Sequence, residues 1–128
     1  MSKITRLEHH DGKQRSYLAA TMIGDLVFPC GQIPADENGQ TPPTIGEQTA
    51  LCLDNLSKSL IRAGSSLGSI LQITVYLAEI DDFEEYDRAY KKAFGQLPLP
   101  PRTTLFVKGF RGMKKIELTA IAAKEERE

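Results

Sequence analysis

The stretch Leu97-Pro98-Leu99-Pro100-Pro101-Arg102-Thr103-Thr104 decides how the end of this chain folds. Proline restricts its own φ and pushes the preceding residue into an extended conformation, so the run is stiff and delivers one guanidinium to a defined place. The apolar residues Leu105-Phe106-Val107 follow and predict a strand that enters the core. A planar guanidinium on such a strand is typical of a carboxylate or phosphate receptor, although a surface arginine beside a turn has the same local pattern.

The composition of the chain limits the classes of protein to which it can belong. The 128 residues predict one domain over residues 1–128, large enough to bury a core without metal or disulfides. The 16 basic and 17 acidic residues are interspersed and give a net charge of −1, which argues against nucleic-acid and membrane partners. The N-terminus lacks the apolar block of a secretory signal, so we expect a cytoplasmic protein in which Cys30 and Cys52 are free thiols. His9 and His10 are adjacent in a polar segment, and no spacing in the sequence predicts a metal site.

Six segments have the alternation, or the apolar run between turn residues, that is typical of strands. They are residues 4–9, 17–22, 26–30, 70–77, 103–107 and 115–123. The second and third are joined by Ile23-Gly24-Asp25 and form a hairpin. In the fourth, the buried face is expected to carry Leu71, Ile73, Val75 and Leu77.

Two segments have helical spacing. The first begins with the capping box Thr44-Ile45-Gly46-Glu47 and ends at Gly64, and its apolar stripe contains Leu53, Leu56, Leu60 and Ala63. The second begins after Asp82, which is expected to cap it, and ends at Gly95. Its aromatic stripe is interpreted as core rather than as a ligand cage, and it consists of Phe83, Tyr86, Tyr90 and Phe94.

The element order β-β-β-α-β-α-β-β predicts an α+β fold. Right-handed crossovers place both helices on one face of a curled sheet of about six strands. Two helices leave the other face of such a sheet open, so we expect another subunit to cover it. Residues 124–128 are expected to form a solvated, frayed tail.

Few residues offer chemistry, because no catalytic triad, phosphate-binding loop or dinucleotide fingerprint is present. Arg102 is the best anion receptor. Cys30 precedes Gly31, whose missing side chain would let a ligand approach the backbone, and an inert buried thiol is the alternative for Cys30. Tyr17 offers a phenol or is a half-buried structural residue, and Asp87 is interpreted as solvent-facing. From the residues alone, we expect a small oligomeric α+β domain that binds a small acid.

Four places resemble the reactive-intermediate deaminase (Rid, or YjgF) family. They are Ser16-Tyr17, Cys30-Gly31-Gln32-Ile33-Pro34, the helix from Asp82-Phe83 to Phe94, and Pro101-Arg102-Thr103 followed by the run from Lys115 to Ala122. The resemblance implies a chorismate-mutase-like fold and a homotrimer with sites between subunits. It implies hydrolysis of 2-iminobutanoate- or 2-iminopropanoate-type imines and enamines to 2-oxo acids and ammonia. No metal or organic cofactor is implied, because the imine carbon is already electrophilic.

The resemblance also assigns site residues. It implies catalytic roles for Arg102, as the anchor of the substrate carboxylate, and for Thr119. It implies a substrate-binding set of Tyr17, Cys30, Gly31, Asp87, Arg102, Thr103 and Thr104.

One departure from the family pattern bears on the mechanism. Thr119 stands where family deaminases commonly carry a second glutamate that positions the water, while Glu117 keeps the first carboxylate. A threonine can hydrogen-bond a water but cannot take its proton near neutral pH. The alternative function is therefore a non-catalytic small-acid-binding protein, a sensor or chaperone-like member of the family. A ribonuclease or translation-inhibitor role is disfavoured by the near-neutral charge.

Overall fold

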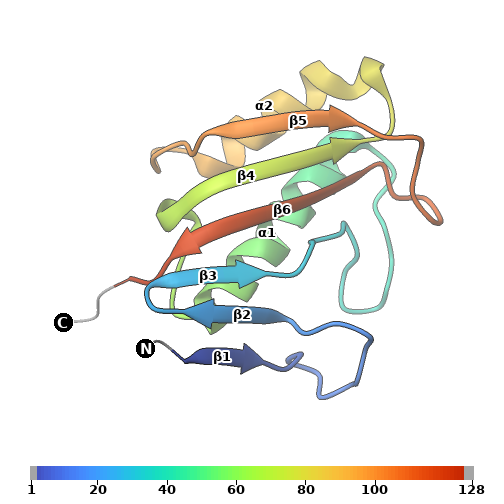
Figure 1. Ribbon diagram of the computed structural model, residues 1–128. Helices are drawn as coiled ribbons and strands as arrows, with labels where there is room; N and C mark the ends of the chain where they lie inside the picture. The colour runs from blue at the N-terminus through green and yellow to red at the C-terminus, as the bar shows by residue number, and fades with distance from the viewer. Residues whose placement is uncertain (1–2, 126–128) are drawn as a thin grey trace.

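The computed structural model describes residues 3–125, and within them two α-helices lie on one face of a six-stranded sheet (Figure 1). The strands are β1 (Ile4–Leu7), β2 (Ala20–Ile23), β3 (Leu26–Pro29), β4 (Ile70–Leu77), β5 (Arg102–Phe106) and β6 (Ile116–Ala123). Their order across the sheet is β1-β2-β3-β6-β4-β5, and only β4 and β5 are parallel. The predicted α+β fold with two helices on one sheet face is confirmed.

Helix α1 (Ile45–Arg62) begins and ends as its sequence predicts. The Thr44 hydroxyl accepts a hydrogen bond from the Glu47 N–H at 3.2 Å and donates one to the Glu47 carboxylate at 2.8 Å. Gly64, with φ of +86°, ends the helix, and the Ser65 N–H closes a Schellman turn on the Leu60 carbonyl at 2.8 Å. The predicted apolar stripe is buried against the sheet.

Helix α2 (Phe83–Phe94) carries its aromatic stripe into the core and ends at Gly95, but Asp82 does not cap it. Asp82 lies in a 3-10 turn (Ile80–Asp82) that runs directly into the helix, and its φ of −83° and ψ of −3° are helical. A capping side chain needs an extended backbone in order to reach the helix amides, so this prediction is wrong. The Glu84 and Glu85 carboxylates remain in the first turn.

Two predictions about which strand residues are buried are wrong, each for a local reason. A register shift between Ile70 and Gln72 turns Leu71 outward, where it is 47% exposed, and places Ile70 in the core instead. Strand β5 is an edge strand that pairs with β4 alone among the described strands, so Leu105 and Phe106 are 47% and 44% exposed rather than buried. Proline-rich sequence before a strand is typical of such an edge.

Polar contacts fix the two ends of β6. The Gln48 side chain is fully buried, donates to the carbonyls of Pro42 and Met113 at 2.9 and 3.1 Å, and accepts from the Lys115 N–H at 2.8 Å. At the other end, the Lys124 and Glu125 N–H groups donate to backbone carbonyls, so the frayed tail predicted there is wrong at these two residues. Residues 126–128 lie outside the described residues.

Candidate functional site

The residues of β5 are divided between the two faces of the sheet. Arg102 is in register with Ile73 and Thr104 with Val75, and both of these β4 partners are fully buried under the helices. Arg102 and Thr104 therefore face α2. Thr103 points to the uncovered face, because successive side chains of a strand alternate.

Arg102 is held by side chains of α2. Its Nη1 donates to Asp87 Oδ1 at 2.8 Å, and its Cζ lies 4.7, 5.1 and 6.0 Å from three ring centroids, those of Tyr90, Tyr86 and Phe83. The aromatic stripe is thus core, as predicted, and also a cage around this guanidinium. The prediction that Asp87 faces solvent is wrong, since its side chain is 23% exposed and paired with Arg102.

The hydroxyls of this α2-side cluster stay protonated. The Tyr86 and Thr104 hydroxyls hydrogen-bond at 2.8 Å, and burial raises the pKa of Tyr86. Burial also raises the pKa of Tyr90 to about 12, and its buried hydroxyl has no partner in the described residues. The charges of the cluster are therefore Arg102, Asp87 and Lys91, whose Nζ lies 3.5 Å from Asp87 Oδ2.

The uncovered sheet face carries a second polar cluster. The strand register aligns Thr103, Thr74 and Thr119 in one row across β5, β4 and β6. A hollow of about 110 Å³ lies there, lined by Gln72, Thr74, Thr119, Ala120 and Ile121. Thr119 and Arg102 therefore lie on opposite faces of the same sheet.

Gly31 lies beside Thr119 at the edge of this second cluster. The segment after β3 is fixed by the Gln32 and Leu118 backbones, which exchange hydrogen bonds of 2.8 and 3.1 Å. A Cβ on Gly31 would collide with Glu117 Oε2 and would lie 3.7 Å from Thr119 Cγ2. The space expected to admit a ligand at Gly31 is thus occupied by the Glu117 carboxylate of the same chain. We had not predicted this contact, because neither residue is near the other in the sequence.

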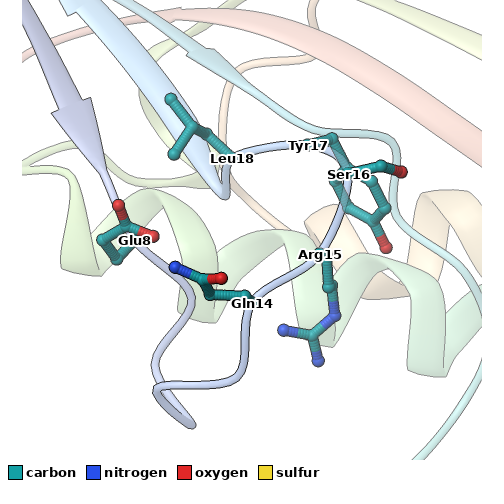
Figure 2. Close-up of a pocket in the computed structure, with 6 residues that line it drawn as sticks. All are labelled: Glu8, Gln14, Arg15, Ser16, Tyr17 and Leu18. Carbon is teal, nitrogen blue, oxygen red and sulfur yellow. The ribbon is translucent and has the colours of Figure 1, made fainter.

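Tyr17 lies in the connection between β1 and β2 and is 55% exposed, so the half-buried alternative is wrong. Its ring meets the His9 ring edge-on at a centroid distance of 5.2 Å. A hollow of about 310 Å³ lies beside Tyr17. The residues that line it all come from the connection between β1 and β2 and are drawn in Figure 2: Glu8, Gln14, Arg15, Ser16, Tyr17 and Leu18. The sequence analysis does not predict that Arg15 lines a hollow, and the only pattern that could have indicated it is its position directly before Ser16-Tyr17.

Cys30 lies between these two regions, since the charges of Arg15 and Glu117 both act on its thiol. It is half-buried, and burial raises the pKa of its thiol, with the Arg15 charge lowering it and the Glu117 charge raising it. Arg15 itself is held by Asp11 at 2.8 and 3.1 Å. Cys30 is accordingly a neutral thiol, and Cys52 is a fully buried one.

Within residues 3–125, no helix is long and apolar enough to cross a membrane. The same residues contain no group of three or more His, Cys, Asp or Glu side chains that could hold a metal ion.

Comparison with known proteins adds four matches. The family model described as Endoribonuclease L-PSP matches residues 11–124. The Escherichia coli protein named "Putative reactive intermediate deaminase TdcF" is 31% identical over 127 residues, which cover 97% of this chain and 98% of that protein. "Protein mmf2, mitochondrial" of Schizosaccharomyces pombe is 38% identical over 114 residues, which cover 84% and 86%. The crystal structure of E. coli TdcF with bound serine has a TM-score of 0.82 and 29% identity, with 94% of each chain covered.

The Asp87–Arg102 pair predicts an acid-sensitive part of the stability. The Arg102 hydrogen bond lowers the pKa of Asp87 below its ordinary 3.8, so the stabilisation is present above about pH 4 and is lost as pH falls through the lowered value. Asp87→Asn should therefore lower the free energy of unfolding at pH 7, and this difference from wild type should shrink in acid. Urea unfolding at both pH values measures it. Asp54→Asn, at the exposed pair with Lys58, is the control and should change little at either pH.

Proposed function

We propose, because this chain belongs to the reactive-intermediate deaminase (Rid, or YjgF) family, that it hydrolyses 2-imino and 2-enamino acids to 2-oxo acids and ammonia. The observation that carries the proposal is the preorganised Arg102 guanidinium. Asp87 and three aromatic rings fix its position, and among residues 3–125 Asp87 alone accepts its hydrogen bonds. The remaining N–H groups can hold a substrate carboxylate.

The proposed site is shared between subunits of a homotrimer. Arg102 and Thr104 lie on the helix side of the sheet, while Gly31 and Thr119 lie on the uncovered side, so one chain does not bring them together. In the proposed cleft, Arg102 of one subunit faces Gly31 and Thr119 of the partner subunit. Apolar side chains 37 to 47% exposed support burial of the uncovered face, and they are Ile23, Leu26, Phe28 and Leu105.

The proposed hydrolysis needs little from the protein beyond the positioning of the substrate and of the attacking water. Arg102 holds the carboxylate, which places the adjacent imine carbon in the cleft, and a water adds to that carbon. Thr119 can hydrogen-bond the water. The serine bound in the crystal structure of E. coli TdcF supports this class of ligand, since serine presents a carboxylate next to a carbon that bears nitrogen.

Thr119 also favours a second candidate function. A threonine in place of the family glutamate suits a protein that uses Arg102 to bind a 2-oxo or amino acid without turnover. Binding of such an acid without ammonia release would establish this function instead.

The proposed assembly predicts a trimer in solution. Because the chain has a mass of 14.2 kDa, light scattering at micromolar concentration and neutral pH should give about three times this value. A monomeric mass would remove the shared cleft and with it the proposed site.

The proposed chemistry predicts enzymatic ammonia release that depends on the parallel N–H donors of the Arg102 guanidinium. Freshly generated 2-iminobutanoate or 2-aminoacrylate should release ammonia faster with protein than in buffer. Arg102→Lys should lower kcat/KM by about 10²-fold or more, because an ammonium cannot form two parallel N–H···O bonds.

Arg88→Lys is the matched control for this substitution. Arg88 lies on the exposed side of α2, next to Asp87 in sequence, and should keep wild-type kinetics. A folded Arg102→Lys protein with unchanged kinetics would show that Arg102 is a structural arginine. A wild type that releases no ammonia above buffer would contradict the deaminase proposal.

A further inference from the structure

We propose that Tyr86 is a positioning residue: its hydroxyl directs the Thr104 hydroxyl outward, so that Thr104 donates a hydrogen bond to the carboxylate that Arg102 holds. The inference rests on the proposed function and deepens its carboxylate site. The hydrogen bond that carries it joins the Tyr86 hydroxyl to Thr104 Oγ1 at 2.8 Å.

Arg102 and Thr104 are neighbours on one face of β5. They are two residues apart on the strand, so both side chains face α2 and their Cα atoms lie about 7 Å apart. The α2 residues that contact them are adjacent in sequence: Asp87 accepts from Arg102 at 2.8 Å, and Tyr86 bonds to Thr104. The Tyr86 ring centroid also lies 5.1 Å from Arg102 Cζ. Tyr86 thus borders both side chains.

Burial decides which of the two hydroxyls is the donor. Tyr86 is fully buried, and Thr104 Oγ1 is the sole hydrogen-bond partner of its hydroxyl among residues 3–125. If Thr104 donated to Tyr86, the phenol proton would be left buried and unpaired, which is costly. Thr104 is half-buried, so its own proton can meet solvent or a ligand. The phenol is therefore the donor and Thr104 Oγ1 the acceptor.

A Thr104 hydroxyl that accepts from Tyr86 keeps one proton to donate elsewhere. Burial raises the pKa of Tyr86, so the phenol stays protonated in the neutral range and the direction of donation does not reverse. A hydroxyl that accepts one hydrogen bond is also a stronger donor in the next. Arg102 and Thr104 thus both present donors to the ligand, and a carboxylate has the oxygens to accept from both.

The second phenol beside Arg102 has no such link to β5. The Tyr90 ring centroid lies closer, 4.7 Å from Arg102 Cζ, but the buried Tyr90 hydroxyl has no hydrogen-bond partner in the part of the chain that the structure describes. The connection between α2 and the hydroxyl on β5 therefore comes from Tyr86.

Tyr86→Phe tests the inference, since it removes the hydroxyl and keeps the ring beside Arg102. Titration with 2-oxobutanoate, as the carboxylate probe, should show an affinity about three- to tenfold weaker, because the Thr104 proton is no longer directed. The KM for the imine should rise by a similar factor. The kcat should change by less than about twofold, since the carboxylate contact is the same before and during the reaction.

A double-mutant cycle separates this role from a structural one. Thr104→Val should weaken the affinity for 2-oxobutanoate by about tenfold or more, because it removes a donor to a charged group. In that background Tyr86→Phe should cost less than about twofold more, since Tyr86 acts through the hydroxyl already removed. Thr104→Ser keeps the hydroxyl and should stay within about twofold of wild type. The two Thr104 variants test the same hydrogen bond from its other end if Tyr86→Phe does not fold.

Thr49→Val is the matched control for the loss of a buried hydroxyl. The Thr49 side chain is fully buried and donates to the Ile45 carbonyl within α1 at 2.7 Å. Its loss should lower Tm, because a buried hydrogen bond is removed, while the affinity for 2-oxobutanoate stays at the wild-type value.

Three outcomes would overturn the inference. They are wild-type affinity in a folded Tyr86→Phe protein, wild-type affinity in Thr104→Val, or an equal loss from Tyr86→Phe with and without the Thr104 hydroxyl. Each would leave the deaminase proposal standing, because that proposal needs Arg102 and not Tyr86. A wild type that binds 2-oxobutanoate with the expected dependence but releases no ammonia would contradict the deaminase proposal alone. A wild type that does not bind 2-oxobutanoate would contradict both.

Discussion

The alternation of side chains along a β-strand, in a sheet covered by helices on one face only, is the constraint on which this structure depends. It buries the apolar half of β4 and β6 under α1 and α2, and it leaves Thr74, Glu117 and Thr119 on the other face. The same alternation turns Arg102 toward α2 and Thr103 away from it. The two halves of the proposed site are therefore separated within one chain by the thickness of its own sheet. A neighbouring subunit against the uncovered face would join them.

The helix-side half is rigid because it belongs to the core. The rings that bury α2 also surround Arg102, and Asp87 occupies one of its nitrogens, so the guanidinium loses little rotamer entropy when a carboxylate binds. The other half is built on β6, whose start is fixed by the buried Gln48 side chain. Both halves thus rest on regular elements rather than on the loops between them. The exposed Tyr17 connection is the exception.

The sequence patterns predicted the elements well because caps, glycine ends and apolar spacing are local signals. The Thr44 capping box, the Gly64 and Gly95 helix ends and the aromatic stripe of α2 are confirmed. Features set by neighbours in space were missed: the β4 bulge that exposes Leu71, the edge position of β5, and the Asp87–Arg102 pair across fifteen residues. The Glu117 contact with Gly31 was missed for the same reason, since it joins β6 to a segment far earlier in the chain. The roles of the site residues stay predictions.

Subunit mixing tests the shared site most directly. Arg102→Lys and Thr119→Phe each disable a different half, the first by removing the two parallel N–H donors and the second by filling the space of the water, so each homotrimer should be nearly inactive on its own. Denatured together in equal amounts and refolded, they should regain about a quarter of wild-type ammonia release, because one cleft in four then combines an intact Arg102 with an intact Thr119 of the partner subunit. If both halves instead acted within one chain, every site in the mixture would lack one residue. Activity that stays at the level of the separate variants, in trimers shown to contain both chains, would contradict the account.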